Sequence, residues 1–152
     1  MLTTDVQQVE ARGLGLALRR LAGQDYTLID APPSLEAARA ASELADGLVI
    51  PTRATFLDLR GLGNLLATVD VSKIVGVVVI AYRGHVAHHR RVLERIEGLG
   101  YPILARVPFS IAASDAGLAG ADLTSYRAAK KTGVAAAYHE LAEGVEQWQK
   151  TD

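Results

Sequence analysis

Four short apolar runs, each rich in β-branched residues, constrain the fold of this chain more than any other feature. They are residues 26–30, 47–51, 74–81 and 103–107. None of them alternates cleanly between apolar and polar side chains, which is the pattern of strands that are buried on both faces of a parallel sheet. Segments with helical periodicity separate the runs, as in right-handed βαβ units. The sequence therefore predicts a three-layer α/β fold, in which helices cover both faces of a mainly parallel sheet.

The segments between the runs carry signals for the beginning and the end of helices. One stripe of leucines has helical spacing and consists of Leu14, Leu18 and Leu21. Gly23 follows this stripe as a C-terminal stop, and Ser34 is placed to cap the beginning of a second helix. Thr55 and Asp58 form a capping-box pattern, which predicts a helix that extends to about residue 69. Further helices are expected over residues 87–99, 111–118 and 134–148.

Length and composition fit a single globular domain over residues 1–152, because 49% of the residues are hydrophobic and 22% are charged. The net charge is −1, so a site for nucleic acid would have to come from local clustering of charge. Cysteine is absent, which excludes disulfides, thiolate zinc sites and cysteine nucleophiles. The N-terminus lacks the basic and apolar parts of a signal peptide, and the apolar run 74–82 is about half a membrane span. We expect a cytoplasmic protein that does not bind membranes.

The strongest local signal for chemistry is the segment 28–34, with the sequence Leu-Ile-Asp-Ala-Pro-Pro-Ser. Asp30 lies at the C-terminal end of a predicted parallel strand, where open α/β sheets bind their ligands, and it could hold Mg²⁺ directly or through water. Pro32 and Pro33 prevent the strand from continuing and keep the next loop extended. The alternative interpretation is that Asp30 only ends a strand and that the prolines form a turn.

The order and spacing of six motifs resemble the ParA/Soj and MinD group of deviant Walker ATPases, over about residues 11–148. The motifs are the Walker B strand (26–34), the "ADxVLIP" strand (45–51), the "LEGLxxLL" helix (57–66), the "hhGVhhTxY" strand (74–82), the "hIP" strand end (106–108) and the terminal helix (132–142). Arg60 stands where the family usually has Glu. The resemblance implies a P-loop NTPase fold that uses ATP and Mg²⁺, and a role in plasmid or chromosome partitioning.

One element of the family is missing from these residues. The Walker A loop, K-G-G-x-G-K-[ST], wraps backbone N–H groups around phosphates, but Gly-Lys occurs nowhere in this sequence. In the family that loop and three strands precede the Walker B strand, whereas only 25 residues precede position 26 here. The resemblance thus covers the C-terminal two-thirds of the family fold, and we expect no ATP hydrolysis by this chain alone. Asp30, Pro32, Pro33 and Pro108 would then form a vestigial nucleotide site, with Asp30 as the former magnesium ligand and no cofactor bound.

A second candidate surface is basic. Arg90, Arg91 and Arg95 share the predicted solvent side of one helix with Glu94, and Arg83 precedes them. ParA proteins bind nonspecific DNA through arginines in this part of the chain, so the resemblance implies a salt-sensitive DNA contact. The alternative is an ordinary solvated helix face.

Several other site types are disfavoured. The family has a second basic motif after the "hIP" strand, and residues 108–112 lack its arginines. His85, His88 and His89 do not form a zinc site, because adjacent helical positions point apart and no carboxylate ligand accompanies them. There is no G-x-S-x-G elbow, and the Gly-Leu-Gly runs do not follow strands, so hydrolase and dinucleotide-binding functions are weakly supported.

The sequence thus indicates a non-catalytic binding or regulatory form of a partitioning protein, in the cytoplasm or at the nucleoid. Its expected partners are DNA, a ParA-type ATPase, a ParB-type adaptor or a second copy, because the predicted strand 26–30 would otherwise have an open edge. Two alternatives stay open. The chain could be a fragment or mis-started form of a complete ATPase that hydrolyses ATP, or an unrelated α/β enzyme with a small-molecule site at the strand ends.

Overall fold

The computed structural model describes residues 8–21, 23–123 and 125–150, and it contains three strands between helices. The strands are β1 (Leu48–Arg53), β2 (Ile74–Tyr82) and β3 (Ile103–Pro108). The α-helices are α1 (Leu14–Arg20), α2 (Leu35–Leu44), α3 (Phe56–Leu66), α4 (Ala87–Glu97), α5 (Ile111–Leu118) and α6 (Val134–Gln149). Three 3-10 helices complete the order, η1 (Ala11–Gly13), η2 (Val71–Lys73) and η3 (Ala129–Lys131).

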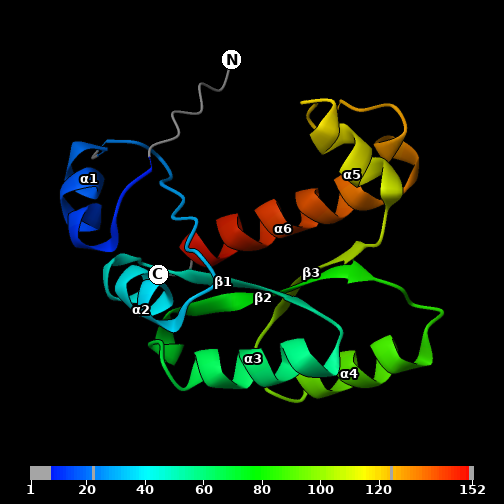
Figure 1. The fold of residues 1–152 in the computed structure, drawn as a ribbon, viewed down its shortest axis with the longest axis horizontal. Helices are drawn as coiled ribbons and strands as arrows, with labels where there is room; N and C mark the ends of the chain where they lie inside the picture. Colours follow the sequence, from blue (N-terminus) through cyan, green and yellow to red (C-terminus); the bar gives the residue numbers. More distant parts are fainter. Residues whose placement is uncertain (1–7, 22, 124, 151–152) are drawn as a thin grey trace.

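The strands form one parallel sheet in the order β1-β2-β3, with β2 in the centre. α3 connects β1 to β2, and α4 connects β2 to β3, so both helices return on the same face of the sheet. Figure 1 shows α3 and α4 side by side below the sheet and α6 across the opposite face. This arrangement confirms the predicted three-layer α/β fold with a parallel sheet and helices on both faces.

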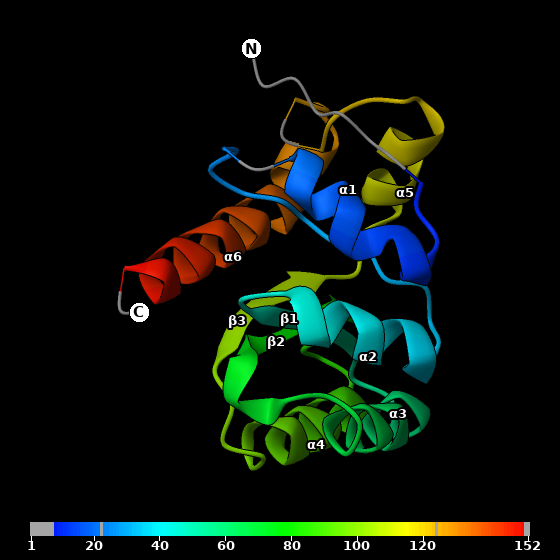
Figure 2. The same ribbon diagram turned by 90° about the vertical axis from the view of Figure 1, so that its left-hand side faces the viewer.

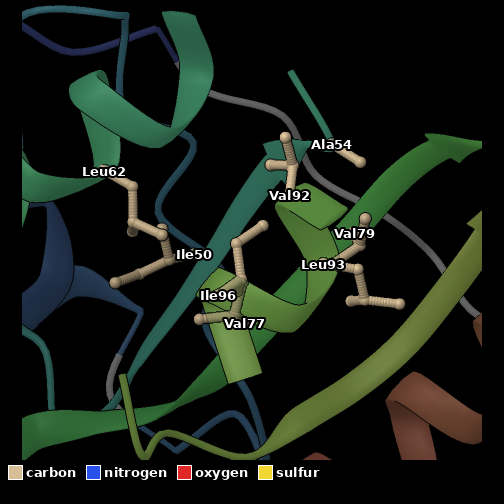
Figure 3. Close-up of a cluster of buried hydrophobic side chains, with 8 residues drawn as sticks. All are labelled: Ile50, Ala54, Leu62, Val77, Val79, Val92, Leu93 and Ile96. Carbon is tan, nitrogen blue, oxygen red and sulfur yellow. The ribbon is translucent and has the colours of Figure 1, made fainter. Parts of the chain in front are cut away.

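The larger core lies between the sheet and the pair α3 and α4. It is drawn in Figure 3 and consists of Ile50, Ala54, Leu62, Val77, Val79, Val92, Leu93 and Ile96. Val79 and Ile96 have no exposed surface at all, and burial of such a side chain contributes about 1.5–3 kcal/mol. Because successive strand residues point to opposite faces, Val78 belongs instead to the cluster under α6, with Ala105 and Val134.

The predicted helix beginnings are confirmed by side-chain caps. Ser34 Oγ accepts from the N–H of Ala37 at 3.1 Å, and Thr55 Oγ1 accepts from the N–H of Asp58 at 3.2 Å. These bonds satisfy N–H groups that the first turn of a helix leaves without a partner. α3 ends at Leu66, three residues earlier than expected, and α4 ends at Glu97 rather than at residue 99. None of the described helices has both the length and the apolar character that crossing a membrane requires.

The prediction of a strand at residues 26–30 is wrong. The segment lies between α1 and α2 as a coil, and the Leu28 side chain is 91% exposed. Tyr26 Oη donates a hydrogen bond to Gln149 Oε1 near the end of α6. A single extended segment becomes a strand only when a neighbour supplies hydrogen bonds along its edge, and no described strand lies beside it. Apolar residues alone therefore do not form a strand here.

β1 is an edge strand, and its burial alternates. Ile50 and Thr52 are buried, whereas Val49, Pro51 and Arg53 are exposed. Burial on both faces is confirmed for β2, in which residues 75–79 are all buried, and it is wrong for β1. The difference follows from position, because β2 has a strand on each side and β1 has a described neighbour on only one.

Candidate functional site

The C-terminal ends of the three strands meet at one edge of the sheet, where ligands bind in open parallel sheets. β1 ends at Arg53, β2 at Tyr82 and β3 at Pro108. The N–H of Phe109 donates to the carbonyl oxygen of Tyr82 at 3.0 Å and so ties the exits of β3 and β2 together. This edge carries the residues that the sequence singled out at position 83 and position 108.

At this edge of the sheet, the side chain of Arg83 lies over an aromatic ring. Its guanidinium carbon lies 3.8 Å from the centroid of the Phe109 ring, which is a cation–π contact. Two residues earlier, Ala81 has a φ of 53°, in the left-handed region, and the pairing of β2 with β3 is irregular between Val79 and Tyr82. Such a backbone costs about 1–2 kcal/mol in a residue other than glycine, so the surrounding structure holds the exit of β2 in a fixed turn. The turn positions Arg83 at the surface.

The three arginines of α4 lie on its exposed side, as the sequence predicted. Arg90, Arg91 and Arg95 are all exposed, while Val92, Leu93 and Ile96 on the same helix are buried. Arg90 Nη1 donates to the carbonyl oxygen of Gly84 at 2.9 Å, which connects the helix to the loop that carries Arg83. We call these exposed arginines, together with Arg83 of the connected loop, the arginine patch (Arg83, Arg90, Arg91 and Arg95).

The arginine patch retains its positive charge. Among the described residues, none of its four guanidinium groups forms an ion pair with a carboxylate. Other arginines are neutralised in this way, since Arg53 pairs with Asp58 at 3.2 Å and Arg106 pairs with Glu97 at 2.7 Å. Exposed guanidinium groups without a carboxylate partner can donate hydrogen bonds to phosphate oxygens.

His89 is built into the arginine patch as an acceptor. The N–H of Arg83 donates to His89 Nδ1 at 3.3 Å, and the His89 ring lies 6.1 Å from the Tyr82 ring. Partial burial lowers the pKa of His89, and the neighbouring His88, Arg83 and His85 lower it further. The imidazole is therefore neutral near pH 7 with Nδ1 free of a proton. No group of three potential ligands in the described part of the chain is arranged to hold a metal ion.

The residues predicted for a vestigial nucleotide site lie in two different segments of the fold. Asp30, Pro32 and Pro33 are exposed in the coil before α2, and no hydrogen bond or ion pair of Asp30 occurs among the described residues. Pro108 lies at the end of β3, and its Cγ is 3.7 Å from where a side chain at Gly133 would begin. A single exposed carboxylate provides too few ligands for Mg²⁺, so Asp30 as a magnesium ligand stays a prediction.

Two open hollows lie elsewhere on the surface. One, of about 400 Å³, is lined by residues of α2 and of the segment 68–73, including Arg39, Asp70 and Lys73. Lys73 Nζ donates there to the carbonyl oxygens of Ser42 at 2.9 Å and Ala45 at 2.8 Å, so this lysine caps the end of α2. The other, of about 270 Å³, lies between β1 and α3. Neither hollow includes Asp30.

Sequence reasoning missed the parts of this edge that surround Arg83. Phe109 is the platform for Arg83, and Arg53 lies at the end of the neighbouring strand β1, paired with Asp58. Both follow or end a predicted strand, and that position is the signal that could have identified them.

Comparisons with known proteins find similarity over most of this chain. No family model matches the sequence. The chain is 33% identical over 148 residues to the uncharacterized protein Rv1708 of Mycobacterium tuberculosis, covering 90% of this chain and 45% of that protein. It is 36% identical over 88 residues to the chromosome-partitioning ATPase Soj of Thermus thermophilus, covering 50% of this chain and 35% of Soj.

A solved structure shows the same fold. The cell division ATPase MinD of Pyrococcus furiosus matches with a TM-score of 0.71 and 24% identity, over 91% of this chain and 59% of that chain. The chain therefore spans less than half the length of the curated relatives it matches and rather more than half of this structural neighbour.

Proposed function

We propose that this chain is a non-catalytic binding form of a partitioning protein that contacts DNA through its arginine patch, because it is similar to Soj over half of its length and shares the fold of MinD. The observation that carries the proposal is the set of four exposed guanidinium groups that no carboxylate neutralises in the described structure. Each phosphate contact by such a group releases condensed counterions, which favours nonspecific binding at low salt.

The shape of the patch supports a phosphate contact rather than base readout. α4 exposes Arg90, Arg91 and Arg95 over about two turns, and Arg83 is held at one end by Phe109 and by the loop. Residues that track a phosphate backbone fix position without reading sequence. The family's second basic motif is absent at residues 108–112, so we expect weaker DNA binding than two basic sites would give.

The test replaces two neighbouring arginines of the patch. Arg90→Ala with Arg91→Ala should weaken binding to a random duplex and reduce the slope of log K against log salt by about 2, since roughly 0.9 ion is released per phosphate. Arg19→Ala with Arg20→Ala on α1 is the matched control, because it removes the same charge from two adjacent exposed helical arginines. Fluorescence anisotropy at two salt concentrations measures both. Equal losses in the two double variants would show that net charge, and not this patch, binds DNA.

The absence of catalysis is the second part of the proposal. These 152 residues contain no Gly-Lys pair, and Asp30 is exposed, so the chain lacks the groups that neutralise a triphosphate. We expect no ATP hydrolysis and no tight nucleotide binding by the purified chain. An ATPase rate above background that Asp30→Ala abolishes would refute this part. Proposed partners besides DNA are a ParA-type ATPase, a ParB-type adaptor and a second copy, in the cytoplasm or at the nucleoid.

One observation favours an enzymatic alternative. The match to MinD covers 91% of this chain but only 59% of the MinD chain, so the remainder of the fold could belong to a longer polypeptide. An in-frame K-G-G-x-G-K-[ST] motif in the DNA upstream of the codon for Met1 would support a complete ATPase, and a stop codon would support the short form.

A further inference from the structure

The free edge of β1 has the features of a site for one more parallel strand. β1 pairs with β2 along one edge only, and no described strand covers the other edge. The open hollow of about 270 Å³ runs beside this edge on the α3 side and is lined by Ile50, Pro51, Leu57, Gly61 and Leu65 among others. Leu57 is 76% exposed there, and a Cβ added at Gly61 would meet no neighbouring atom within 4 Å. A strand at this edge would therefore place side chains in an apolar groove.

The other face of β1 is also apolar at this edge. Val49 is 38% exposed, and Pro51 is exposed on the same face of the strand. Apolar side chains of β1 would thus flank an added strand on both faces of the sheet, and a short, continuous apolar run without alternation suits such a position. Pro51 provides no N–H and so cannot donate to a ladder, which agrees with the position of β1 at an edge of the sheet.

The chain itself contains one unpaired segment with this composition. Residues 26–30 are Tyr-Thr-Leu-Ile-Asp, they form no strand in the described structure, and Leu28 is 91% exposed. The Tyr26 hydroxyl donates a hydrogen bond to Gln149 of α6, so in its own chain the segment contacts α6. Because Leu28 is already exposed, the segment can meet the edge of a second molecule.

The 26–30 segment and β1 end in residues of opposite charge, which would lie side by side if the two pair in parallel. The segment ends with Asp30, and β1 ends with Arg53, each of them the fifth residue counted from Tyr26 and from Val49. Parallel alignment of these five-residue stretches places the Asp30 carboxylate beside the Arg53 guanidinium, which is exposed and paired only with the nearby Asp58 among the described residues. Cross-strand pairs of opposite charge favour this register over neighbouring ones.

We propose that two copies of this chain associate by reciprocal strand addition, in which the 26–30 segment of each copy pairs in parallel with the free edge of β1 of the other. The proposal names the surface for the second-copy partner put forward above. The contact is isologous, because each copy gives one segment and accepts one, and such an exchange closes as a dimer. Two short strands bury little surface, so the association is weak and depends on concentration.

The test uses engineered cysteines, since the sequence contains none. Leu28→Cys protein is mixed with Pro51→Cys protein under mild oxidation, without DNA, so that failure leaves the DNA-binding proposal untouched. Adjacent positions on paired strands have Cα atoms close enough for a disulfide, and a covalent dimer of the two variants is expected. The control mixes Leu28→Cys with Leu118→Cys, because Leu118 on α5 is 89% exposed and lies outside the proposed contact.

The cross-linking rates distinguish strand addition between two copies from pairing within one chain and from random collision. Faster cross-linking of the 28/51 mixture than of the 28/118 mixture supports strand addition between copies. Equal rates overturn it, and so does a double variant Leu28→Cys with Pro51→Cys that closes its disulfide within a monomer. As a second measurement without cysteines, sedimentation of the unmodified chain should show a dimer at high concentration that Leu28→Asp abolishes and Leu118→Asp retains. A monomer at every concentration up to the solubility limit overturns the proposal.

Discussion

The region of the molecule around β2 and the region that precedes β1 are both rich in apolar residues, yet the described core clusters lie only in the first. Val79 on β2 and Ile96 on α4 are completely buried. Before β1, by contrast, Leu16 is 57% exposed, Leu28 91% and Leu35 50%. Figure 2 shows the compact stack of the sheet on α3 and α4, with α1 and the coil after it on the far side of the sheet. Apolar residues are buried where structural neighbours surround them, and remain exposed where the described residues provide no such neighbours.

The largest expected effect comes from shortening one buried and one exposed aliphatic side chain to alanine, one in each of the two regions. Ile96→Ala should lower the free energy of unfolding by about 3–4 kcal/mol, because a fully enclosed side chain leaves a cavity when it is shortened. Leu28→Ala should change it by less than about 0.5 kcal/mol, since water already surrounds this side chain. Urea titrations at low protein concentration measure both. A cost above about 2 kcal/mol for Leu28→Ala would show that residues 26–30 are packed in the monomer.

The sequence predicted most of the fold because the signals for β1, β2, β3 and their connecting helices are local. Continuous apolar runs and caps at Ser34 and Thr55 specify elements whose neighbours lie within the same chain. The same signal failed at residues 26–30, because a strand depends on a partner that no periodicity encodes.

The candidate site was predictable only in part. The exposed arginines of α4 follow from helical spacing, since Val92, Leu93 and Ile96 determine which side is buried. The contact of Arg83 with Phe109 was not predictable, because it joins the exits of two strands that are 26 positions apart in the sequence. Tertiary pairing of β2 with β3 brings these residues together.

A smaller effect is expected from replacing two glycines by alanine, one in the crowded strand β2 and one on the open side of α3. A Cβ at Gly76 in β2 would lie 2.6 Å from the carbonyl oxygen of Pro102, so Gly76→Ala should destabilise the chain by about 1–3 kcal/mol. A Cβ at Gly61 in α3 would meet nothing within 4 Å, and alanine is the better helix former, so Gly61→Ala should stabilise by roughly 0.5–1 kcal/mol. Thermal unfolding of both variants measures the difference. Destabilisation by Gly61→Ala in the isolated monomer would show that the groove beside β1 is already occupied.

The smallest expected effect is the pH dependence of stability that comes from His89, a partly buried residue at the exit of β2. Burial and nearby positive charge lower the pKa of His89 below the value of an unfolded histidine, so the native chain binds this proton less readily than the unfolded chain. Stability from this group is therefore complete above the unfolded pKa of about 6.5 and declines as the pH falls from there toward the folded pKa. His89→Gln should remove that part of the decline, whereas His139→Gln, at an exposed position of α6, should leave it in place. Urea midpoints between about pH 5 and pH 8 measure the slopes. The same decline in His89→Gln as in the parent chain would show that burial and the neighbouring positive charges do not lower the pKa of His89 in the folded chain.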